Sequence, residues 1–524
     1  MFQKITLSIL SAFLLFISWP PFSQFTFLIF LAFVPLFIIE SHLHKKHITL
    51  KSYYIYVYLA FFLFNLCTTF WVKNAHFGGA VFAILCNSFF MATIFSLYVK
   101  VQSLVKWKYT FFILPIFWIG FEYLHLNWDL SWPWLTLGNV FSSHPNWVQW
   151  YSVTGVLGGT LWIFIVNRYF FRIYQSRKKR YIAFLLLALI VPLIISKKIH
   201  DTASEMRAHQ HMNVLVVQPN INPYYEKFSM SQESQTKLLL DLATPKINHE
   251  LDFLILPETF LVSAIWQHKF DTNAHIKKFN PLITQFPNLN IIVGAVTFQL
   301  SEKGPRAKPS SSYPDQWYKV YNSALHIKNN NIQVYNKSKL VPGAEQMPFQ
   351  RFFYPIFGDQ ILQIGNSTAL GNFAIQDTVS VFSSYSGMKI APIICYESIY
   401  GDYVRKFIQK GADAIFIITN DGWWKKTSGY KQHNMYAQLR AIETRRYIAR
   451  SANTGISSII NHLGEIQESI LWDKKDVISY QLPVYDRKTF YVEYGDFLGR
   501  FCGFFSALIL LSSFVMNKLK IKTN

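Results

Sequence analysis

The feature that most limits how this chain can fold is a set of long, nearly uncharged apolar blocks at its two ends. Seven lie before residue 200, and an eighth runs over Phe497–Met516. The third, fourth and eighth reach the ~20 residues that a helix needs to cross a bilayer. The first seven run roughly over Ile5–Pro20, Phe25–Ile39, Tyr53–Val72, Gly79–Val99, Tyr109–Leu124, Val153–Val166 and Tyr181–Ile195. We therefore predict a bundle of about eight membrane spans.

Basic residues indicate how these spans are oriented. Loops that would share a side with the N-terminus carry 16 Lys and Arg residues, whereas the short loops on the other side carry only Lys73. The sixteen are Lys4, Lys45, Lys46, Lys51, Lys100, Lys106, Lys108, Arg168, Arg172, Arg177, Lys178, Lys179, Arg180, Lys518, Lys520 and Lys522. Because cytoplasmic loops are enriched in Lys and Arg, we predict that both termini are cytoplasmic.

This topology divides the chain into three parts. Residues 1–196 form a seven-span region, residues 197–493 face outward, and residues 494–524 form the last span with a basic cytoplasmic tail. The cytoplasmic lysines and arginines also account for much of the net charge of +21. We find no Walker A loop, dinucleotide glycine fingerprint, HExxH or CxxC, so we expect no cofactor, no metal and no nucleic acid.

The outward segment has a mixed α/β pattern. Helical stretches at Ser231–Leu242 and Gln432–Arg450 alternate with short apolar runs, and the second helix is expected to be amphipathic. A hairpin is expected from Ile456–Asn461 and Glu465–Leu471. The runs that read as buried strands are Val214–Val217, Phe253–Leu256, Ile291–Val296, Ile390–Cys395 and Ala414–Thr419. Such alternation indicates an α/β domain with a largely buried sheet.

Three polar residues stand where such runs end: Glu258 after LILP, Lys337 after IQVYN and Cys395 after IAPII. Singly they could be a helix cap, a surface lysine and a core thiol. Cys395 is, however, the only one of four cysteines outside the predicted spans. A carboxylate in an apolar pocket can take a proton from a thiol, and an ammonium can stabilise the thiolate and an oxyanion. Together the three suffice for acyl transfer through a thioester.

The segments LPETF, YNKSKLVPGAEQMP and ICYES resemble the Glu-Lys-Cys triad motifs of the nitrilase superfamily. The chain is most similar to a membrane branch of it, the apolipoprotein N-acyltransferases. Further matching segments are SWPWLTLG at 131–138, QPNINPYYEKF at 218–228, NDGWW at 420–424 and residues 432–455. The resemblance covers nearly the whole chain. It implies an α-β-β-α nitrilase-like sandwich inserted between spans seven and eight.

The resemblance also implies roles for individual residues. Cys395 would be the nucleophile, Glu258 the general base, and Lys337 the stabiliser of thiolate and oxyanion. Glu345, eight residues after the lysine, would support the site. Tyr396 would supply a backbone N–H to the oxyanion hole, and Glu397 would help to shape the site.

Two positions depart from the family pattern. Ala344 stands where the family often has glycine, and Phe228 stands near a common tryptophan position. The second departure keeps an aromatic ring but loses the indole N–H, which concerns substrate contact rather than the triad.

The activity implied is N-acylation of the diacylglyceryl-cysteine at a lipoprotein N-terminus. The acyl donor would be a phospholipid, most simply phosphatidylethanolamine, and the location the bacterial inner membrane with the catalytic domain in the periplasm. Two alternatives stay open from the residues alone. One is a membrane-anchored amidase or nitrile hydrolase with the same triad, and the other is a transporter or scaffold with an inert outward domain.

Overall fold

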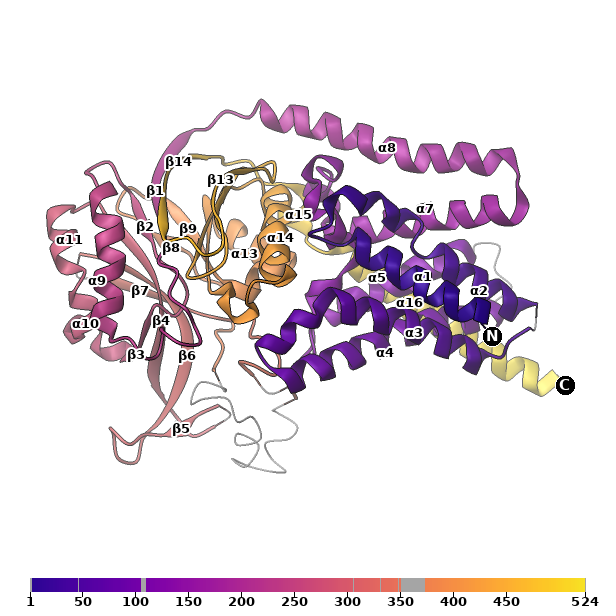
Figure 1. Cartoon of the computed structure of the whole chain (residues 1–524), viewed down its shortest axis with the longest axis horizontal. Coiled ribbons are helices and arrows are strands. Elements are labelled where there is room, and N and C mark those ends of the chain that lie inside the picture. Colours follow the sequence, from indigo (N-terminus) through magenta and orange to yellow (C-terminus); the bar gives the residue numbers. More distant parts are fainter. Residues whose placement is uncertain are drawn as a thin grey trace. The chain divides into compact units, whose positions relative to one another are not determined.

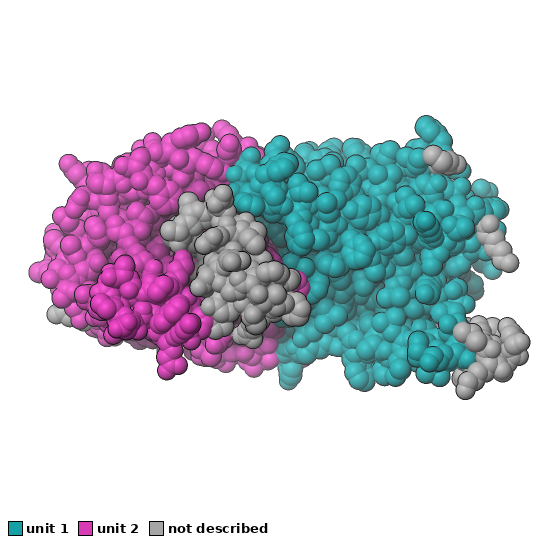
Figure 2. All heavy atoms as spheres, turned by 90° about the horizontal axis from the view of Figure 1, so that it is seen from below, with its two compact units in different colours: residues 1–204, 494–524 teal, residues 205–493 magenta. Residues whose placement is uncertain are grey.

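A computed structural model describes residues 2–45, 47–104, 110–304, 306–329, 331–346, 348–349 and 373–523, with side chains only up to residue 518 in the last helix. The chain divides into two compact units, a helical unit of residues 1–204 with 494–524 and an α/β unit of residues 205–493. Figure 1 traces the elements of both units, and Figure 2 colours the units separately. Of the basic residues named above, Lys46, Lys106 and Lys108 lie outside the described residues, as do the side chains of Lys520 and Lys522.

The helical unit contains six helical stretches that are long and apolar enough to cross a membrane. These are Ser23–His44, Leu50–Asn74, Phe77–Leu104, Val156–Ser176, Lys179–Ser204 and Phe497–Lys518. Two shorter apolar helices, Phe2–Ser18 and Thr110–His125, complete the set within the described part of the chain. Multiple membrane-length helices are thus confirmed, whereas the count of eight spans stays a prediction.

The elements of this unit are α1 (Phe2–Ser18), η1 (Ser23–Phe30), α2 (Val34–His44), α3 (Leu50–Thr69), η2 (Phe70–Asn74), α4 (Phe77–Leu104), η3 (Thr110–Phe112), α5 (Ile113–His125), η4 (Pro133–Leu135), η5 (Leu137–Ser143), η6 (Pro145–Trp147), α6 (Tyr151–Thr154), α7 (Val156–Ser176), α8 (Lys179–Ser204) and α16 (Phe497–Thr523). Helix α16 packs against α5, where Ser506 donates a hydrogen bond to the carbonyl of Ile116. The last helix of the chain therefore belongs to the same unit as the first seven apolar blocks.

A buried charge pair joins three helices of this unit. Arg168 of α7 lies 3.5 Å from the Glu40 carboxylate of α2, and Tyr98 of α4 donates a 2.8 Å hydrogen bond to the same carboxylate. Arg168 also donates to the Tyr98 hydroxyl and lies over the Phe37 ring, 4.1 Å from its centroid. We call Glu40, Tyr98 and Arg168 the Arg168 cluster. It pairs one cation with one carboxylate among aromatic rings.

The α/β unit contains two sheets. The first has eight strands in the order β14-β1-β2-β4-β6-β5, with β3 paired to β4 and β7 to β6. The second has six, in the order β13-β12-β11-β10-β9-β8. The strands are β1 (Gln210–Gln218), β2 (Phe253–Ile255), β3 (Leu261–Trp266), β4 (Asn290–Ser301), β5 (Lys308–Pro309), β6 (Trp317–Lys328), β7 (Asn331–Asn336), β8 (Phe382–Ser383), β9 (Lys389–Ile394), β10 (Ala414–Thr419), β11 (Ile448–Ala452), β12 (Ser457–Ile460), β13 (Ile466–Ile470) and β14 (Asp476–Val484).

Helical elements accompany these strands. They are α9 (Gln232–Ala243), η7 (Thr244–Lys246), η8 (Gln267–Thr272), α10 (Ala274–Lys277), α11 (Asn280–Gln285), η10 (Cys395–Ile399), α13 (Gly401–Gln409), η11 (Asp421–Trp424), α14 (Ser428–Thr444) and α15 (Phe490–Tyr494). Helices α9, α10 and α11 gather on one side of the first sheet (Figure 1). Helices α13 and α14 lie against strands of the second sheet.

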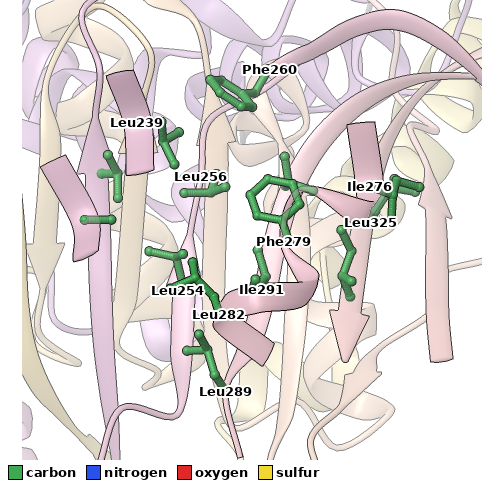
Figure 3. Close-up of a cluster of buried hydrophobic side chains, with 14 of the residues drawn as sticks. Leu239, Leu254, Leu256, Phe260, Ile276, Phe279, Leu282, Leu289, Ile291 and Leu325 are labelled. Atoms are coloured by element: carbon green, nitrogen blue, oxygen red, sulfur yellow. The ribbon is translucent and has the colours of Figure 1, made fainter. Parts of the chain in front are cut away.

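Alternation along the first sheet explains how its two faces are covered. Leu254 of β2 and Ile291 of β4 face α9 and α11 in a buried apolar core (Figure 3). Phe253, one residue away, points to the opposite face and packs edge-on against Phe416 of β10, with ring centroids 5.2 Å apart. Since successive side chains of a strand point to opposite faces, the first sheet is covered by helices on one side and by the second sheet on the other.

The structure confirms the five predicted strands and the hairpin, in which β12 and β13 pair antiparallel. The prediction of one helix over Gln432–Arg450 is wrong in its second part. Helix α14 ends at Thr444, because Arg445 adopts a left-handed φ of 53°. Residues 448–452 then form β11, which lies between β10 and β12.

The expected amphipathic character of that helix is also wrong. The charged residues that suggested an exposed face are all buried: Arg440, Glu443, Arg445 and Arg446. Their heads bind backbone carbonyls or one another; Arg440, for instance, donates a 2.8 Å hydrogen bond to Glu443. Charge alone therefore gave no guide to the exposed side of α14.

Candidate active site

The predicted triad residues each follow the carboxyl end of a strand. Glu258 comes three residues after β2, Lys337 directly after β7 and Cys395 directly after β9. Strands β2 and β4 are parallel, and β7 runs parallel to them because both β4 and β7 pair antiparallel with β6. Glu258 and Lys337 therefore leave the first sheet at the same edge, where ligands of α/β proteins commonly bind.

Lys337 is the centre of a buried charge cluster. Its Nζ lies 3.2 Å from Oε1 of Glu258 and 2.9 Å from Oε1 of Glu345. Burial alone would lower the pKa of Lys337, but the two carboxylates outweigh burial and raise it well above its ordinary value. Lys337 is therefore an ammonium group at neutral pH, and it shares its charge between two acids.

Asn322 on β6 belongs to the same cluster, although the sequence analysis did not identify it. Its Nδ2 lies 2.8 Å from Oε1 of Glu258 and 3.1 Å from Oε1 of Glu345. We call Glu258, Asn322, Lys337 and Glu345 the Lys337 cluster. Gly294 on β4 makes room for it, because a Cβ there would come within 2.6 Å of the Glu258 Cα.

Cys395 is the first residue of η10 and directly follows β9 in a strained turn. Its φ is +50°, a left-handed conformation that non-glycine residues rarely adopt, and its side chain is buried. Burial raises the pKa of the thiol, Glu258 raises it further, and Lys337 opposes them without reversing the direction. The resting thiol is therefore protonated at neutral pH, and it lies within the electrostatic reach of both predicted partners.

Glu397 connects the cysteine turn to the lysine loop. Its Oε1 accepts hydrogen bonds from the backbone N–H groups of Ser338 and Lys339, at 2.7 and 3.1 Å. Its Oε2 accepts one from the N–H of Ile394 at 3.0 Å. Burial raises the pKa of Glu397, while hydrogen bonds to its charged form oppose that shift. The side chain thus joins backbone next to the lysine to backbone next to the cysteine.

The predicted aromatic residues separate into buried and exposed positions. Tyr396 is buried, and its ring packs edge-on against Tyr400 at a centroid distance of 5.4 Å. Phe228 is 58% exposed and its ring lies 6.4 Å from that of Trp423. The departure at Phe228 therefore concerns the surface of the α/β unit.

A buried lysine that the sequence analysis overlooked lies behind Glu258. Nζ of Lys227 donates hydrogen bonds to Oγ1 of Thr259 at 2.6 Å and to the carbonyl of Glu258 at 3.4 Å. Burial lowers the pKa of Lys227 to about 8, although Glu258 acts in the opposite direction. Thr259 itself has a φ of +44°. Lys227 therefore binds a strained backbone segment that carries the predicted base.

A second polar group, also missed, lies behind Cys395. His433 and Asp421 contact each other at 2.9 Å, and Arg450 contacts Asp421 at 2.8 Å. Nε2 of His433 lies 3.2 Å from the carbonyl of Cys395. The segments 420–424 and 432–455 resembled the family in sequence, but that signal carried no role for these side chains.

The arrangement suits acid–base and nucleophilic chemistry. Among the described residues, no three His, Cys, Asp or Glu side chains stand close enough to hold a metal ion. What the described residues bring together is a protonated thiol, a cation and two carboxylates. Such a set can activate a nucleophile and stabilise an oxyanion.

Comparison with known proteins indicates the family to which the chain belongs. Residues 11–169 match the family described as "Apolipoprotein N-acyltransferase N-terminal domain", and residues 200–489 match "Carbon-nitrogen hydrolase". The apolipoprotein N-acyltransferase of Chlorobaculum tepidum is 28% identical over 515 residues, which cover 95% of this chain and 94% of that protein. Apolipoprotein N-acyltransferase 1 of Treponema denticola is 25% identical over 525 residues, again 95% and 94%.

Solved nitrilase-superfamily structures resemble the chain only distantly. Saccharomyces cerevisiae Nit3 matches 53% of this chain and 91% of its own, at 15% identity and a TM-score of 0.36, too low to carry an inference. The two family matches lie in the helical and the α/β parts of the chain, and the two relatives align along nearly all of it. The chain is thus a multi-pass membrane acyltransferase with a carbon-nitrogen hydrolase domain, and it belongs to the apolipoprotein N-acyltransferase family.

Proposed function

We propose that the chain transfers an acyl group from a phospholipid to the N-terminal amine of a diacylglyceryl-lipoprotein, with Cys395 as nucleophile, Glu258 as general base and Lys337 as oxyanion stabiliser. The observation that carries this proposal is the Lys337 cluster. One ammonium contacts the carboxylates of Glu258 and Glu345, and Glu258 acts electrostatically on the thiol of Cys395. One carboxylate can thus accept a proton while the other keeps the ammonium paired.

In the first step Glu258 takes the thiol proton as sulfur attacks the ester carbonyl of the phospholipid. Proton transfer accompanies attack, because the raised pKa of Cys395 leaves little thiolate beforehand. Lys337 and the backbone N–H of Tyr396 stabilise the oxyanion. The C–O bond then breaks, Glu258 returns the proton to the leaving oxygen, and a lysophospholipid departs from the acyl-thioester.

In the second step the free α-amino group of the diacylglyceryl-cysteine attacks the thioester carbonyl. Glu258 accepts a proton from the amine as the C–N bond forms. The C–S bond then breaks, and Glu258 returns that proton to the sulfur. The products are the N-acylated lipoprotein and the free enzyme, so protons balance over the cycle without a cofactor.

The remaining site residues act on the geometry of the triad. Glu345 keeps Lys337 in place, since it binds both the ammonium and the backbone N–H of Val341 at 2.8 Å. Glu397 fixes the turn of Cys395 against the loop that follows Lys337. Both side chains are buried or nearly so, which makes their hydrogen bonds costly to lose.

The cellular setting follows from the chemistry of the substrates. Both carry acyl chains that strongly prefer the bilayer, which is consistent with the membrane-length helices. We propose phosphatidylethanolamine as donor, eight spans, both termini in the cytoplasm and the catalytic domain in the periplasm of the bacterial inner membrane. In this arrangement residues 1–196 and 494–524 supply the spans, and residues 197–493 supply the catalytic domain.

The test is intact-protein mass spectrometry of the detergent-purified chain mixed with phosphatidylethanolamine, with Cys395→Ala as control. We expect a hydroxylamine-sensitive acyl adduct on the unchanged protein, none on the variant, and discharge by a diacylglyceryl peptide. Discharge by water at the same rate would instead indicate a hydrolase. No adduct with any phospholipid would contradict a phospholipid donor.

A further inference from the structure

Side chains of α14 hold the turn that carries Cys395 at both of its ends. The turn is η10, Cys395–Ile399. Nε2 of His433 lies 3.2 Å from the carbonyl of Cys395, and a guanidinium N–H of Arg440 donates to the carbonyl of Ile399. His433 and Arg440 are seven residues apart, so they project from one face of α14 two turns apart. One helix face therefore fixes the first and last carbonyls of the nucleophile turn.

The carbonyl of Cys395 has two side-chain donors. The Ser398 hydroxyl donates to it at 2.7 Å and lies 3.0 Å from Nε2 of His433. Since this hydroxyl has a single proton and the carbonyl has none, Nε2 is assigned as an N–H donor. Two donors on one carbonyl leave that group little freedom to rotate.

Two buried charged groups lie behind the ring of His433. Its Nδ1 lies 2.9 Å from Oδ1 of Asp421 and 2.9 Å from Nη2 of Arg450. All three side chains are fully buried. Burial lowers the pKa of His433, and Asp421 opposes that shift without reversing it, so the neutral ring with hydrogen on Nε2 prevails at neutral pH. Nη2 of Arg450 then donates to the free Nδ1 and to Oδ2 of Asp421, while Oδ1 of Asp421 accepts its hydrogen bond from Thr419 at 3.0 Å rather than from the ring.

Because a peptide bond is planar, a restraint on the carbonyl of Cys395 also restrains the N–H of Tyr396. The bond between Cys395 and Tyr396 is planar, and in a trans peptide the C=O and the following N–H point in opposite directions. Any group that fixes the Cys395 carbonyl therefore fixes the direction of the Tyr396 N–H. The φ of +50° at Cys395 adds a need for such a restraint, because strained conformations persist only where surrounding groups enforce them.

We infer that His433 is a positioning residue which, together with Ser398, fixes the plane of the Cys395–Tyr396 peptide and so aims the Tyr396 N–H at the oxyanion. The inference rests on the proposed role of Cys395 as nucleophile. Hydrogen bonds to the carbonyl also polarise the peptide, which strengthens the N–H as a donor. His433 acts through the backbone and touches neither substrate nor sulfur in this role.

Two reagents that react with Cys395 in the full-length, detergent-purified protein distinguish the orientation of the Tyr396 N–H from the accessibility of the thiol. Acylation by p-nitrophenyl butyrate passes through an oxyanion, whereas alkylation by iodoacetamide does not. Both rates are read at the Cys395 peptide by mass spectrometry. For His433→Phe we expect acylation to fall about 30-fold, below the loss of a whole oxyanion-hole donor, while alkylation changes less than about 3-fold.

Conservative and matched variants sharpen the test. His433→Gln keeps an N–H donor near the position of Nε2, so it should recover most of the acylation rate. Ser398→Ala, a smaller change, should lower acylation about 5-fold, since it removes one neutral hydrogen bond of modest net strength. His326→Phe is the control: His326 is buried on β6, and its ring nitrogens lie within hydrogen-bond distance of Asn290 and Gln333 rather than of the cysteine turn. It should lose thermal stability but leave the ratio of the two rates unchanged.

Three results would overturn the inference. They are unchanged acylation in both His433→Phe and Ser398→Ala, an equal loss of acylation and alkylation in these variants, or an altered rate ratio in His326→Phe of the same size. A failure of the proposed phospholipid chemistry looks different, because the unchanged protein would then be acylated by p-nitrophenyl butyrate but not by phosphatidylethanolamine.

Discussion

The two units of the molecule each bury a charge cluster, and the clusters differ in their charge balance. The Arg168 cluster of the helical unit pairs one cation with one carboxylate, packed against the rings of Phe37 and Tyr98. The Lys337 cluster of the α/β unit gives one cation two carboxylates. A balanced pair has no spare charge, whereas the second cluster has one negative charge in excess.

The two clusters also differ in their cation, which is an arginine in the helical unit and a lysine in the α/β unit. Arginine stays charged, and its planar head suits fixed pairing and ring stacking, which matches a structural role in the Arg168 cluster. Lysine is a compact charge on a flexible stem that can follow a developing oxyanion. The comparison teaches that a buried ion pair suggests chemistry when its charges do not cancel, and the following changes test that rule.

The largest effect is expected when the net charge of the Lys337 cluster is removed by changing Glu258, the proposed general base. Glu258→Gln keeps a group that can bind Lys337 and Asn322 but cannot accept a proton. Acylation of Cys395 by phosphatidylethanolamine should fall about 10³-fold, within the range for loss of a general base. The rate is measured by intact-protein mass spectrometry, with iodoacetamide alkylation as a control for access. A loss below about 5-fold would show that Glu258 is not the base.

Removal of the cation should have the next largest effect. Lys337→Met leaves Glu258 and Glu345 without a cationic partner and removes the proposed oxyanion stabiliser, so acylation should fall about 10²-fold. Thermal stability should fall as well, because breaking a buried pair leaves uncompensated charge. Lys337→Arg should fail to restore the rate, since the guanidinium head does not fit a point-charge site. Full recovery in that variant would contradict the distinction drawn between the two cations.

Glu345→Gln also gives the Lys337 cluster a balanced charge, but it leaves the proposed base in place. We expect acylation to fall only about 10-fold, through poorer placement of Lys337. The rates of Glu345→Gln and Glu258→Gln should be measured side by side under identical conditions. If Glu345→Gln proved the slower of the two, the roles of the two carboxylates would have to be exchanged.

Lys227→Met should change the rate only about 3-fold, by loosening the backbone at Glu258 and Thr259. Its clearer effect is on stability against pH. The folded pKa of Lys227 is about 8, below the ordinary 10.5, so the unfolded chain binds more protons between these values and stability rises with pH across that window. The melting temperature of the unchanged protein should thus rise relative to that of Lys227→Met as the pH is raised from about 8 to 10.5. Parallel melting curves would contradict the lowered pKa.

The smallest effect on rate is expected from the helical unit. Arg168→Met should leave the acylation rate per folded molecule within about 2-fold, because the Arg168 cluster has no spare proton acceptor. Its melting temperature should fall, and the further change Glu40→Gln should recover part of that loss, as expected when an unpaired buried charge is removed. A fall in rate of about 10-fold at unchanged stability would break the comparison, because a balanced pair would then take part in function.

Three residues of the proposed site can be picked out in the sequence because they stand at strand ends. Glu258, Lys337 and Cys395 each follow an apolar run, so a change from apolar to polar marks them. Asn322 gives no such signal, since it lies within the long strand β6 and looks like any polar strand residue. Its role depends on contacts to residues 64 positions earlier and 23 positions later in the chain.

The charged positions of α14 misled for a related reason. Their spacing predicted a solvated face, but α14 packs against η10 and the second sheet, so the same charges bind carbonyls instead. Gly294 is a further case: its need for a missing Cβ arises only when the Glu258 backbone crosses β4. Periodicity reports which residues share a face, whereas the partner of that face is a tertiary property.

The pairing of β1 with β14 has a consequence for how the chain is built during synthesis. Gln210 at the start of β1 lies opposite Val484 at the end of β14, so the α/β unit takes in the chain and releases it at neighbouring points. A newly made chain can insert helices up to α8 long before α16 leaves the ribosome. Closing this strand pair returns the chain to the point at which it entered the α/β unit, so the segment that leads to α16 leaves beside the segment that follows α8. The α/β unit of nearly three hundred residues therefore connects α8 to α16 in the way that a short loop would.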